Sequence, residues 1–315
     1  GAGQGVYPGI QTYVRTTGEY WFEPLTNGKP YTFTVKARDQ NGNRSGALSV
    51  SATPPGSLNA GGGNGVLKII DNMICEIHTF TANTTPLGGQ EAYTLTFYSG
   101  DKRPASVEVL VVAGGGGGGG SKGNGYTSSG GGAGRFVYHP AFQLADAGTI
   151  TVKVGAGGAG GASGGGQGSN GGDSGFVRSD GYKIAAPGGG GGNGNSGYGG
   201  VGNSGGSGGG SHFNSSATNA IPGTVPAGDG VMNLGSNGHN SFVGGGAGES
   251  TSGISGAGAE SAISGELKTY SKGGGLNSPD GENGTGNGGG GKGGGAGAGT
   301  NGGSGIVIVR WPYIY

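Results

Sequence analysis

Residues 107–120 read VEVLVVAGGGGGGG, so an apolar run typical of a buried strand leads directly into consecutive glycines. Glycine is concentrated beyond this point: residues 1–110 hold 16 of the 89 glycines, and residues 111–315 hold the other 73. Glycine makes up about 7% of an average domain and roughly a third of this part. Because glycine has no side chain to bury, order here must come from backbone packed against backbone.

Several structures compete to explain such glycine runs. Collagen needs glycine at every third position with abundant proline, and the run Gly114–Gly120 has neither. A disordered linker and irregular glycine loops on a β scaffold both stay open. Polyglycine II consists of left-handed extended helices with three residues per turn, which can pack closely and exchange N–H···O=C bonds. We expect an ordered bundle of this kind, because short apolar segments interrupt the glycine runs at intervals.

Composition excludes several classes of protein. The chain has 17 basic and 17 acidic residues, and its aromatic residues do not alternate with Arg or Lys as in a nucleic-acid groove. The longest apolar run, Val109–Ala113, is far shorter than the roughly 20 residues that span a bilayer. The single Cys75 excludes an internal disulfide framework and a cysteine-based metal site. We expect no nucleic-acid partner, no membrane insertion, no metal and no cofactor.

The first part of the chain shows strand patterns. In residues 31–37, YTFTVKA, apolar and polar residues alternate, and residues 47–50 supply the partner strand. The stretch YTFTVKARDQNGNRSG (31–46), with Leu25 six residues before Tyr31, resembles the last strands of a fibronectin type III domain, including its tyrosine corner. A complete domain of that kind has roughly 100 residues. We therefore predict a partial fibronectin type III-like module over residues 1–55, whose earlier strands are missing, replaced or supplied upstream, and a linker over residues 56–65.

From residue 66 onward the sequence predicts short strands, and no segment has helical periodicity with capping residues. The predicted fold class is all-β: β-sandwich-like strands with a polyglycine II helix bundle, after the partial module. Residues 66–315 are predicted to form one glycine-rich tip domain. Its strands are expected at residues 66–70, 73–81, 93–98, 107–113, 135–144, 149–154, 176–178, 182–186, 241–243 and 306–311.

The order of these segments resembles the glycine-rich domains of tailed-phage tail-fibre and adhesin proteins, over residues 77–311. That resemblance implies a strand scaffold from which loops and polyglycine helices project toward a host surface. The stretch Ser211–Leu234, which is poor in glycine, departs from the family pattern. The matching segments are IHTFT (77–81), VEVLVVAGGGGGGG (107–120), GAGRFVYHPAF (132–142), TITVKVGAGGAGG (149–161), GSNGGDSGF (168–176), AAPGGGGGN (185–193) and GGSGIVIVRW (302–311).

Motifs of catalysis are weak against this glycine background. The pattern G-x-S-x-G at residues 205–209 lacks an α/β sheet to support a nucleophile, and Gly172–Gly175 (GDSG) favours a turn. Cys75 and His78 are an odd number of residues apart, so a strand places them on opposite faces, with Cys75 buried. An alternative is a calcium loop from Asp280, Glu282, Asn283 and Asn287, whose oxygens suit that ion. We assign no catalytic residue and expect no enzyme activity.

Recognition is the favoured chemistry. Bulky or polar residues within the glycine-rich part have no obvious core to enter, and exposed rings beside Asn and Ser suit carbohydrate or protein binding. The alternative is that each ring closes the end of the bundle or fills a subunit contact. The candidate receptor-binding residues are Tyr126, Tyr198, His212, Phe213, Asn214, Met232, His239 and Tyr270.

These observations lead to one preferred hypothesis about function. The chain is expected to be a virion protein, the adhesin at the tip of a phage tail fibre. Its expected partners are a host cell-surface receptor (a glycan or an outer-membrane protein) and other tail-fibre or tail-tip proteins, and the fibre context favours a homotrimer. One alternative is a structural subunit of an extracellular filament or bacterial surface layer. A polysaccharide depolymerase is a third possibility, for which the sequence nominates no carboxylate pair.

Overall fold

The computed structural model describes residues 11–14, 20–23, 31–36, 41–52, 60–71, 73–82, 87–97, 103–145, 148–194, 200–212 and 215–313. All named elements in these residues are strands, joined in antiparallel pairs, which confirms the all-β prediction. Within the described ranges no helix is long and apolar enough to cross a membrane. The chain divides into two compact units, Gly1–Leu58 and Asn59–Ile314.

The first unit contains two antiparallel strand pairs. β1 (Gln11–Val14) pairs with β2 (Tyr20–Glu23), and β3 (Tyr31–Val35) pairs with β4 (Leu48–Ala52). In the second pair Phe33 lies opposite Val50. The alternating residues 31–37 and their partner segment therefore form the expected pair of strands, although β3 ends at Val35.

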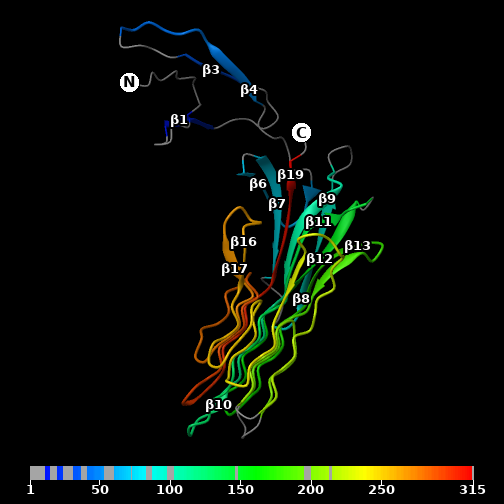
Figure 1. Ribbon diagram of the computed structural model, residues 1–315, viewed down its shortest axis with the longest axis vertical. Coiled ribbons are helices and arrows are strands. Elements are labelled where there is room, and N and C mark those ends of the chain that lie inside the picture. The colour runs from blue at the N-terminus through cyan, green and yellow to red at the C-terminus, as the bar shows by residue number, and fades with distance from the viewer. Residues whose placement is uncertain are drawn as a thin grey trace. The chain divides into compact units, whose positions relative to one another are not determined.

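The second unit is built on two antiparallel sheets (Figure 1). The larger sheet has the strand order β15 (Met232–Leu234), β11 (Phe136–Gln143), β9 (Ser106–Val112), β19 (Ile306–Pro312), β7 (Met73–Thr81), β6 (Asn64–Ile70). The smaller sheet has the order β14 (Lys183–Ala186), β13 (Ser174–Arg178), β12 (Thr149–Gly155), β8 (Gln90–Phe97), β5 (Ala60–Gly61).

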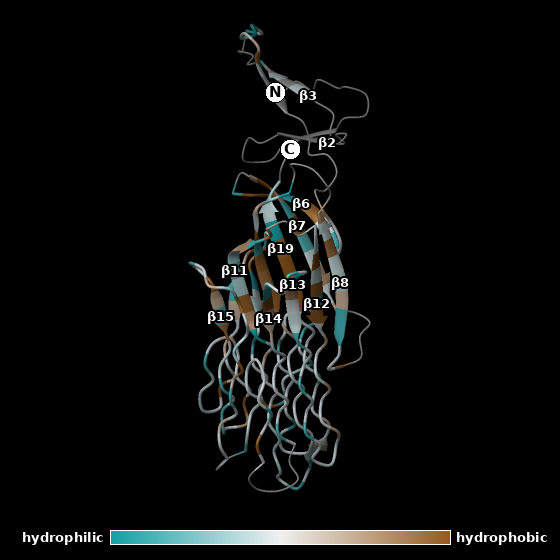
Figure 2. Ribbon diagram, turned by 90° about the vertical axis from the view of Figure 1, so that its right-hand side faces the viewer, coloured by the Kyte–Doolittle hydropathy of each residue, from teal (hydrophilic) through white to brown (hydrophobic). Residues whose placement is uncertain are grey.

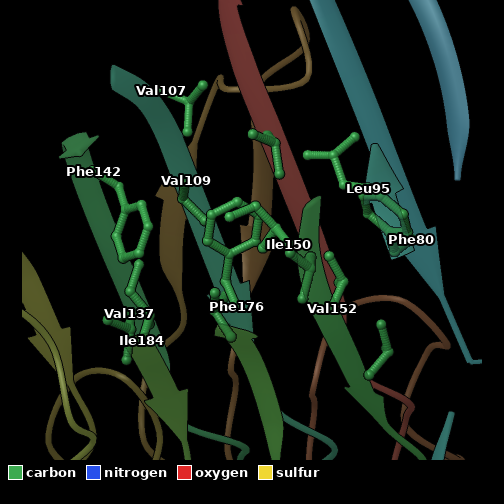
Figure 3. Close-up of a cluster of buried hydrophobic side chains, with 14 of the residues drawn as sticks. Phe80, Leu95, Val107, Val109, Val137, Phe142, Ile150, Val152, Phe176 and Ile184 are labelled. Carbon is green, nitrogen blue, oxygen red and sulfur yellow. The ribbon is translucent and has the colours of Figure 1, made fainter. Parts of the chain in front are cut away.

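The main hydrophobic core lies between these sheets (Figure 3). Val107, Val109 and Val111 of β9 point into it, and the rings of Phe142 and Phe176 meet edge to face there with centroids 5.1 Å apart. Strand alternation sends the intervening residues of β9 to the opposite face of the larger sheet.

A second core cluster covers that opposite face. Leu110 and Val112 of β9 join it, together with Phe136 and the ring of Tyr270. Two short strands, β16 (Ala259–Ser261) and β17 (Lys268–Tyr270), form a hairpin whose residues Ala259 and Tyr270 belong to this cluster. Because both faces of β9 are buried, VEVLVV is a continuous apolar run rather than an alternating one.

Glycine-rich segments run side by side as extended backbone from the ends of the sheet strands; they are the pale region in the lower half of Figure 2. We call residues 113–120, 128–135, 155–161, 168–173, 187–194, 201–210, 235–238, 242–247, 271–291 and 299–305 the glycine bundle. At its centre, Gly114–Gly120 donates its N–H groups in rotation to three neighbouring segments. At 2.8–3.0 Å, residues 114, 117 and 120 donate to carbonyls 172, 169 and 166; residues 115 and 118 to 303 and 300; and residues 116 and 119 to 132 and 129.

The carbonyl groups of Gly114–Gly120 complete this pattern. They accept N–H groups from three further segments, residues 158–161, 189–192 and 289–292, again at every third position. A Cβ atom on Gly118 would lie 2.0 Å from the Gly290 carbonyl oxygen, whereas an ordinary C···O contact is about 3.3–3.6 Å. Only glycine permits this approach, which explains the glycine content of the segment.

Asn and Asp side chains replace carbonyl acceptors on the outer segments. Asn301 Oδ1 accepts the N–H of Gly160 at 2.9 Å, and Asn170 Oδ1 accepts that of Gly191 at 2.9 Å. Asp173 Oδ1 accepts from Gly188 in the same way. These side chains satisfy backbone donors at the rim of the bundle, a role the sequence analysis did not assign to them.

Two predicted boundaries need correction. Residues 56–65 were predicted as a linker, but β5 and the start of β6 lie within this range. Ala60 is buried, and its N–H donates to Glu76 Oε1 at 3.0 Å, so this backbone is fixed to the sheets. The strand predicted at residues 241–243 does not form: Phe242 has a φ of 67°, a left-handed conformation that no strand allows.

Candidate functional site

The turns at the far end of the glycine bundle lie together. Gly114–Gly120 leaves β9, and residues 128–135 return to β11. Between them β10 (Ser121–Lys122) pairs with β18 (Ala296–Gly297) at the end away from the sheets (Figure 1). Backbone hydrogen bonds join the other turns to this end, including Gly164 N–H to Ser121 O and Ser211 N–H to His239 O. We call the described residues 121–127, 162–167, 200, 211–212, 215–217, 239–241 and 292–298 the distal loops.

Tyr126 lies in the first of these loops and is held by its own backbone. Its carbonyl accepts the Ser121 hydroxyl at 2.9 Å, and its N–H donates to Gly123 O at 3.2 Å. The Lys122 ammonium lies 4.8 Å from the centroid of the Tyr126 ring, within range of a cation–π contact. A half-buried ring and an exposed ammonium group are thus presented together.

His212 and His239 also lie in the distal loops. The His212 ring meets the Phe242 ring edge to face, with centroids 5.1 Å apart. Phe242 is itself buried and its N–H donates to Ser211 O at 3.0 Å, so it supports the loop from beneath. His239 is half-buried and its Nδ1 has no hydrogen-bond partner. The structure therefore brings Tyr126, His212 and His239 to one end of the unit.

The remaining candidates have other positions. Tyr270 is 1% exposed in the second core cluster, with its ring 6.4 Å from that of Phe136, so its assignment to a binding surface is corrected. The expectation that this ring had no core to enter overlooked the face of the larger sheet. Met232 is exposed on the edge strand β15, beside the sheets and not among the distal loops. Tyr198, Phe213 and Asn214 lie outside the described residues.

The oxygens considered for a calcium loop already have partners. Asp280 Oδ1 accepts the N–H of Asn301 at 2.8 Å, and Asn283 Oδ1 accepts that of Ser304 at 3.1 Å. Asn287 Oδ1 accepts the N–H of Lys272, and Glu282 contacts Lys268 Nζ at 3.1 Å. Within the described ranges no group of three or more His, Cys, Asp or Glu side chains is placed to hold a metal ion.

Cys75 and His78 lie on opposite faces of β7, as strand alternation predicts. Cys75 belongs to the second core cluster, where burial raises the pKa of its thiol. His78 lies on the other face, stacked on Trp311 with ring centroids 5.3 Å apart, and its Nε2 lies 2.9 Å from Glu76 Oε1. Glu76 and His78 are both buried, and His78 Nδ1 donates to Gly62 O at 2.6 Å. This polar pair holds the segment between β5 and β6 in place. Glu76 and His78 are two residues apart, so a strand puts both side chains on one face, and this spacing could have predicted the pair.

Other buried titratable groups are also structural. Arg135 Nε donates to Asn233 Oδ1 at 2.8 Å and its Nη2 donates to Asn233 O at 2.7 Å, while burial lowers the pKa of its guanidinium. Burial likewise lowers the pKa of His139, whose Nδ1 accepts the N–H of Ala141 at 3.1 Å. Both groups hold backbone near β15 and β11, far from the distal loops.

Comparison with known proteins assigns the chain to a sequence family. A search of the curated proteins found no match. A family model described as a glycine-rich domain matches residues 84–312. The match covers most of the chain, including the glycine bundle and every strand of the two sheets except β5, β6 and β7, and so the chain belongs to this glycine-rich domain family.

Proposed function

We propose that the glycine bundle consists of polyglycine II helices and that this unit is the tip of a phage tail fibre, an adhesin without enzyme activity. The hydrogen bonds of Gly114–Gly120 support the first part, because they repeat every third residue, the period of such a helix. The six neighbours around this segment leave little freedom to its backbone. Amide hydrogen exchange tests the proposal: residues 114–120 and 128–135 should exchange far more slowly than an unstructured peptide.

The distal loops carry the proposal of receptor binding. A rigid bundle holds them at one end, so little ordering entropy is lost when a receptor binds. Polar and aromatic side chains there suit a host glycan or an outer-membrane protein. In this proposal the module in residues 1–55 is fibronectin type III-like and joins the tip to other tail-fibre or tail-tip proteins, the assembly is a homotrimer, and the protein resides in the virion.

The binding test uses labelled full-length chain on a panel of bacterial strains, before and after periodate oxidation of surface glycans or protease shaving of surface proteins. Binding to some strains, lost after one of the two treatments, is the expected result. Tyr126→Ser should weaken it, and Met232→Ser, on the edge of the sheets, should leave it unchanged. The opposite result would move the site to β15. Equal, negligible binding to every strain would favour the alternative of a structural filament subunit, which electron microscopy of polymers would reveal.

A further inference from the structure

Asparagine followed by glycine recurs along this chain, and such a pair can react with itself. The backbone nitrogen of the glycine attacks the side-chain carbonyl carbon of the asparagine, and glycine has no Cβ to obstruct the attack. The asparagine backbone must rotate to bring the two atoms together, and solvent must reach the glycine N–H. A hydrogen bond on that N–H, or a fixed backbone, therefore protects the pair. In the described part of the second unit these pairs begin at Asn64, Asn124, Asn170, Asn193, Asn237, Asn283, Asn287 and Asn301.

In five of these pairs the glycine N–H is bonded to a neighbouring segment. Gly171 N–H donates to Gly189 O at 2.9 Å, and Gly302 N–H donates to Gly158 O at 2.9 Å. The other three bonds, at 2.9–3.0 Å, run from the N–H groups of Gly238, Gly284 and Gly288 to the carbonyls of Thr218, Ser304 and Lys272. Each bond must break before the nitrogen can attack, so the packing of the glycine bundle protects these asparagines.

Two further pairs are held by their backbone. Asn64 and Gly65 lie within β6, whose pairing with β7 begins at Asn64 itself. Asn193 is 5% exposed; its N–H donates to Gly210 O at 3.2 Å, and its carbonyl accepts the Ser129 N–H at 2.9 Å. Neither backbone can rotate toward its side chain without loss of these contacts.

The pair Asn124–Gly125 in the first distal loop has no such protection. It occupies the centre of a β-turn that is closed by one bond, Tyr126 N–H to Gly123 O at 3.2 Å. The φ angles of 55° and 79° at the two central residues are typical of a type I′ turn, for which Asn-Gly is the preferred sequence. The N–H of the third residue lies outside the hydrogen-bonded ring of such a turn, and among the described residues Gly125 N–H has no partner. Both residues are exposed, and a Cβ atom on Gly125 would meet nothing within 4 Å.

We infer that Asn124 is a site of spontaneous deamidation and the fastest to react of these pairs. The Gly125 nitrogen loses its proton to water and forms a bond to Asn124 Cγ. The Cγ–Nδ2 bond breaks, and the nitrogen leaves as ammonia after taking up a proton from water. Water then adds to either carbonyl carbon of the resulting succinimide ring. Opening of the bond to Cγ gives aspartate, and opening of the bond to the backbone carbonyl carbon gives isoaspartate. In both cases one amide and one water become a carboxylic acid and ammonia.

The reaction changes the charge of the loop that carries Lys122 and Tyr126. The Lys122 ammonium lies 4.8 Å from the centroid of the Tyr126 ring, and the new carboxylate arises in the turn between these two residues. The electrostatics of this loop therefore change with the age of the protein. The reaction needs only the chain and water, so it does not rest on the proposed function.

The test follows each asparagine by peptide mapping. The full-length chain is incubated in mildly alkaline buffer made with heavy-oxygen water, both folded and in urea, then digested with pepsin and analysed by mass spectrometry. We expect the Asn124 peptide to give labelled aspartate and isoaspartate nearly as fast in the folded chain as in urea. Peptides with Asn170 and Asn283 should convert at least about tenfold more slowly in the folded chain than in urea, a factor that corresponds to one buried backbone hydrogen bond.

Two alanine variants test the nucleophile. Gly125→Ala places a methyl group beside the attacking nitrogen and should remove most of the conversion at Asn124. Gly295→Ala is the matched control in the distal loops, because its Cβ also meets nothing within 4 Å, and it should leave the conversion unchanged. Equal rates in the two variants would show that the Gly125 nitrogen is not the nucleophile.

Three results of the mapping would overturn the inference. The first is an Asn124 that stays intact in the folded chain while the chain in urea converts. The second is conversion of Asn170 and Asn283 as fast as that of Asn124 in the folded chain. The third is aspartate without isoaspartate, because a succinimide opens to both.

Discussion

Replacing Gly118 by alanine tests whether backbone contact alone orders the glycine bundle. The new Cβ would lie 2.0 Å from the Gly290 carbonyl oxygen. The segment with Gly290 must therefore retreat by roughly 1.3 Å to reach an ordinary C···O contact. Gly290 O accepts the N–H of Thr300 at 2.9 Å, and Thr300 O accepts the N–H of Gly118 at 2.9 Å. Three segments consequently share the displacement.

The cost follows from the two hydrogen bonds that link Gly118, Thr300 and Gly290. A buried donor or acceptor left without a partner costs about 1–3 kcal/mol, so disruption of both bonds costs roughly 2–6 kcal/mol. Alanine also lowers the conformational entropy of the unfolded chain, which raises the free energy of unfolding by about 0.4–1 kcal/mol. The net loss is about 3 kcal/mol in the free energy of unfolding. At about 2–4 °C per kcal/mol for a unit of this size, Tm should fall by about 9 °C.

Calorimetry of the full chain measures this shift, and hydrogen exchange of peptides that cover residues 114–120 and 289–292 locates it. Gly295→Ala is the matched control, because a Cβ there meets nothing within 4 Å. It should change Tm by no more than about 2 °C, as surface substitutions do. If Gly118→Ala behaves like the control in both measurements, the segments are not in contact and our explanation of the glycine content is wrong.

Four further predictions concern the polar groups that fasten the fold. Glu76→Leu leaves buried His78 without its partner and should cost about 3–5 kcal/mol in denaturant unfolding, whereas Glu76→Gln should cost less. Arg135→Lys loses the forked hydrogen bonds and should lower the free energy of unfolding by about 2 kcal/mol, with no change in binding to the panel of bacterial strains. Asn301→Leu should cost about 1–3 kcal/mol and Asn301→Asp clearly less, because aspartate keeps the acceptor oxygen. Burial, with a hydrogen bond to Glu91, raises the pKa of Tyr93 to about 12. The folded state favours the neutral phenol of Tyr93, so its contribution to the free energy of unfolding is complete below about pH 10 and is lost as pH rises toward 12. Tyr93→Phe should therefore reduce the fall in Tm over that interval.

The strands of the sheets were predictable where the pattern is local and long. Residues 73–81 and 149–154 were predicted as strands within a residue of β7 and β12, because apolar and β-branched residues dominate each run. The hairpin β16–β17 was missed, because its strands have three residues each and depend on the core cluster that they cover. Sequence separation is the physical reason: β17 ends at Tyr270, whose packing partner Phe136 lies on a strand far earlier in the chain.

The candidate site was predictable in part for the same reason. Tyr126, His212 and His239 follow or precede glycine runs, and runs that leave and return to a sheet place their turns at one end. Tyr270 has a similar sequence context, because a glycine run begins at Gly273. It lies at the start of that run, however, where the glycine bundle meets the sheets, and its side chain is buried. The rim role of Asn301 was not predictable, because its acceptor function appears only when Gly160 of another segment lies beside it.

The glycine bundle separates the stability of the tip from the composition of its loops. Stability in most domains comes from side chains, so a surface loop can change only as far as the core beneath allows. Here much of the support beneath the loops is backbone: Lys292 N–H donates to Gly119 O at 3.2 Å, and Ser129 N–H donates to Asn193 O at 2.9 Å. Replacing Lys122 or Tyr126 changes no bond of this lattice, because neither side chain is among its donors or acceptors. We therefore expect substitutions in the distal loops to be tolerated far better than substitutions of Gly114–Gly120, where every added Cβ would lie 1.9–2.3 Å from a neighbouring carbonyl oxygen.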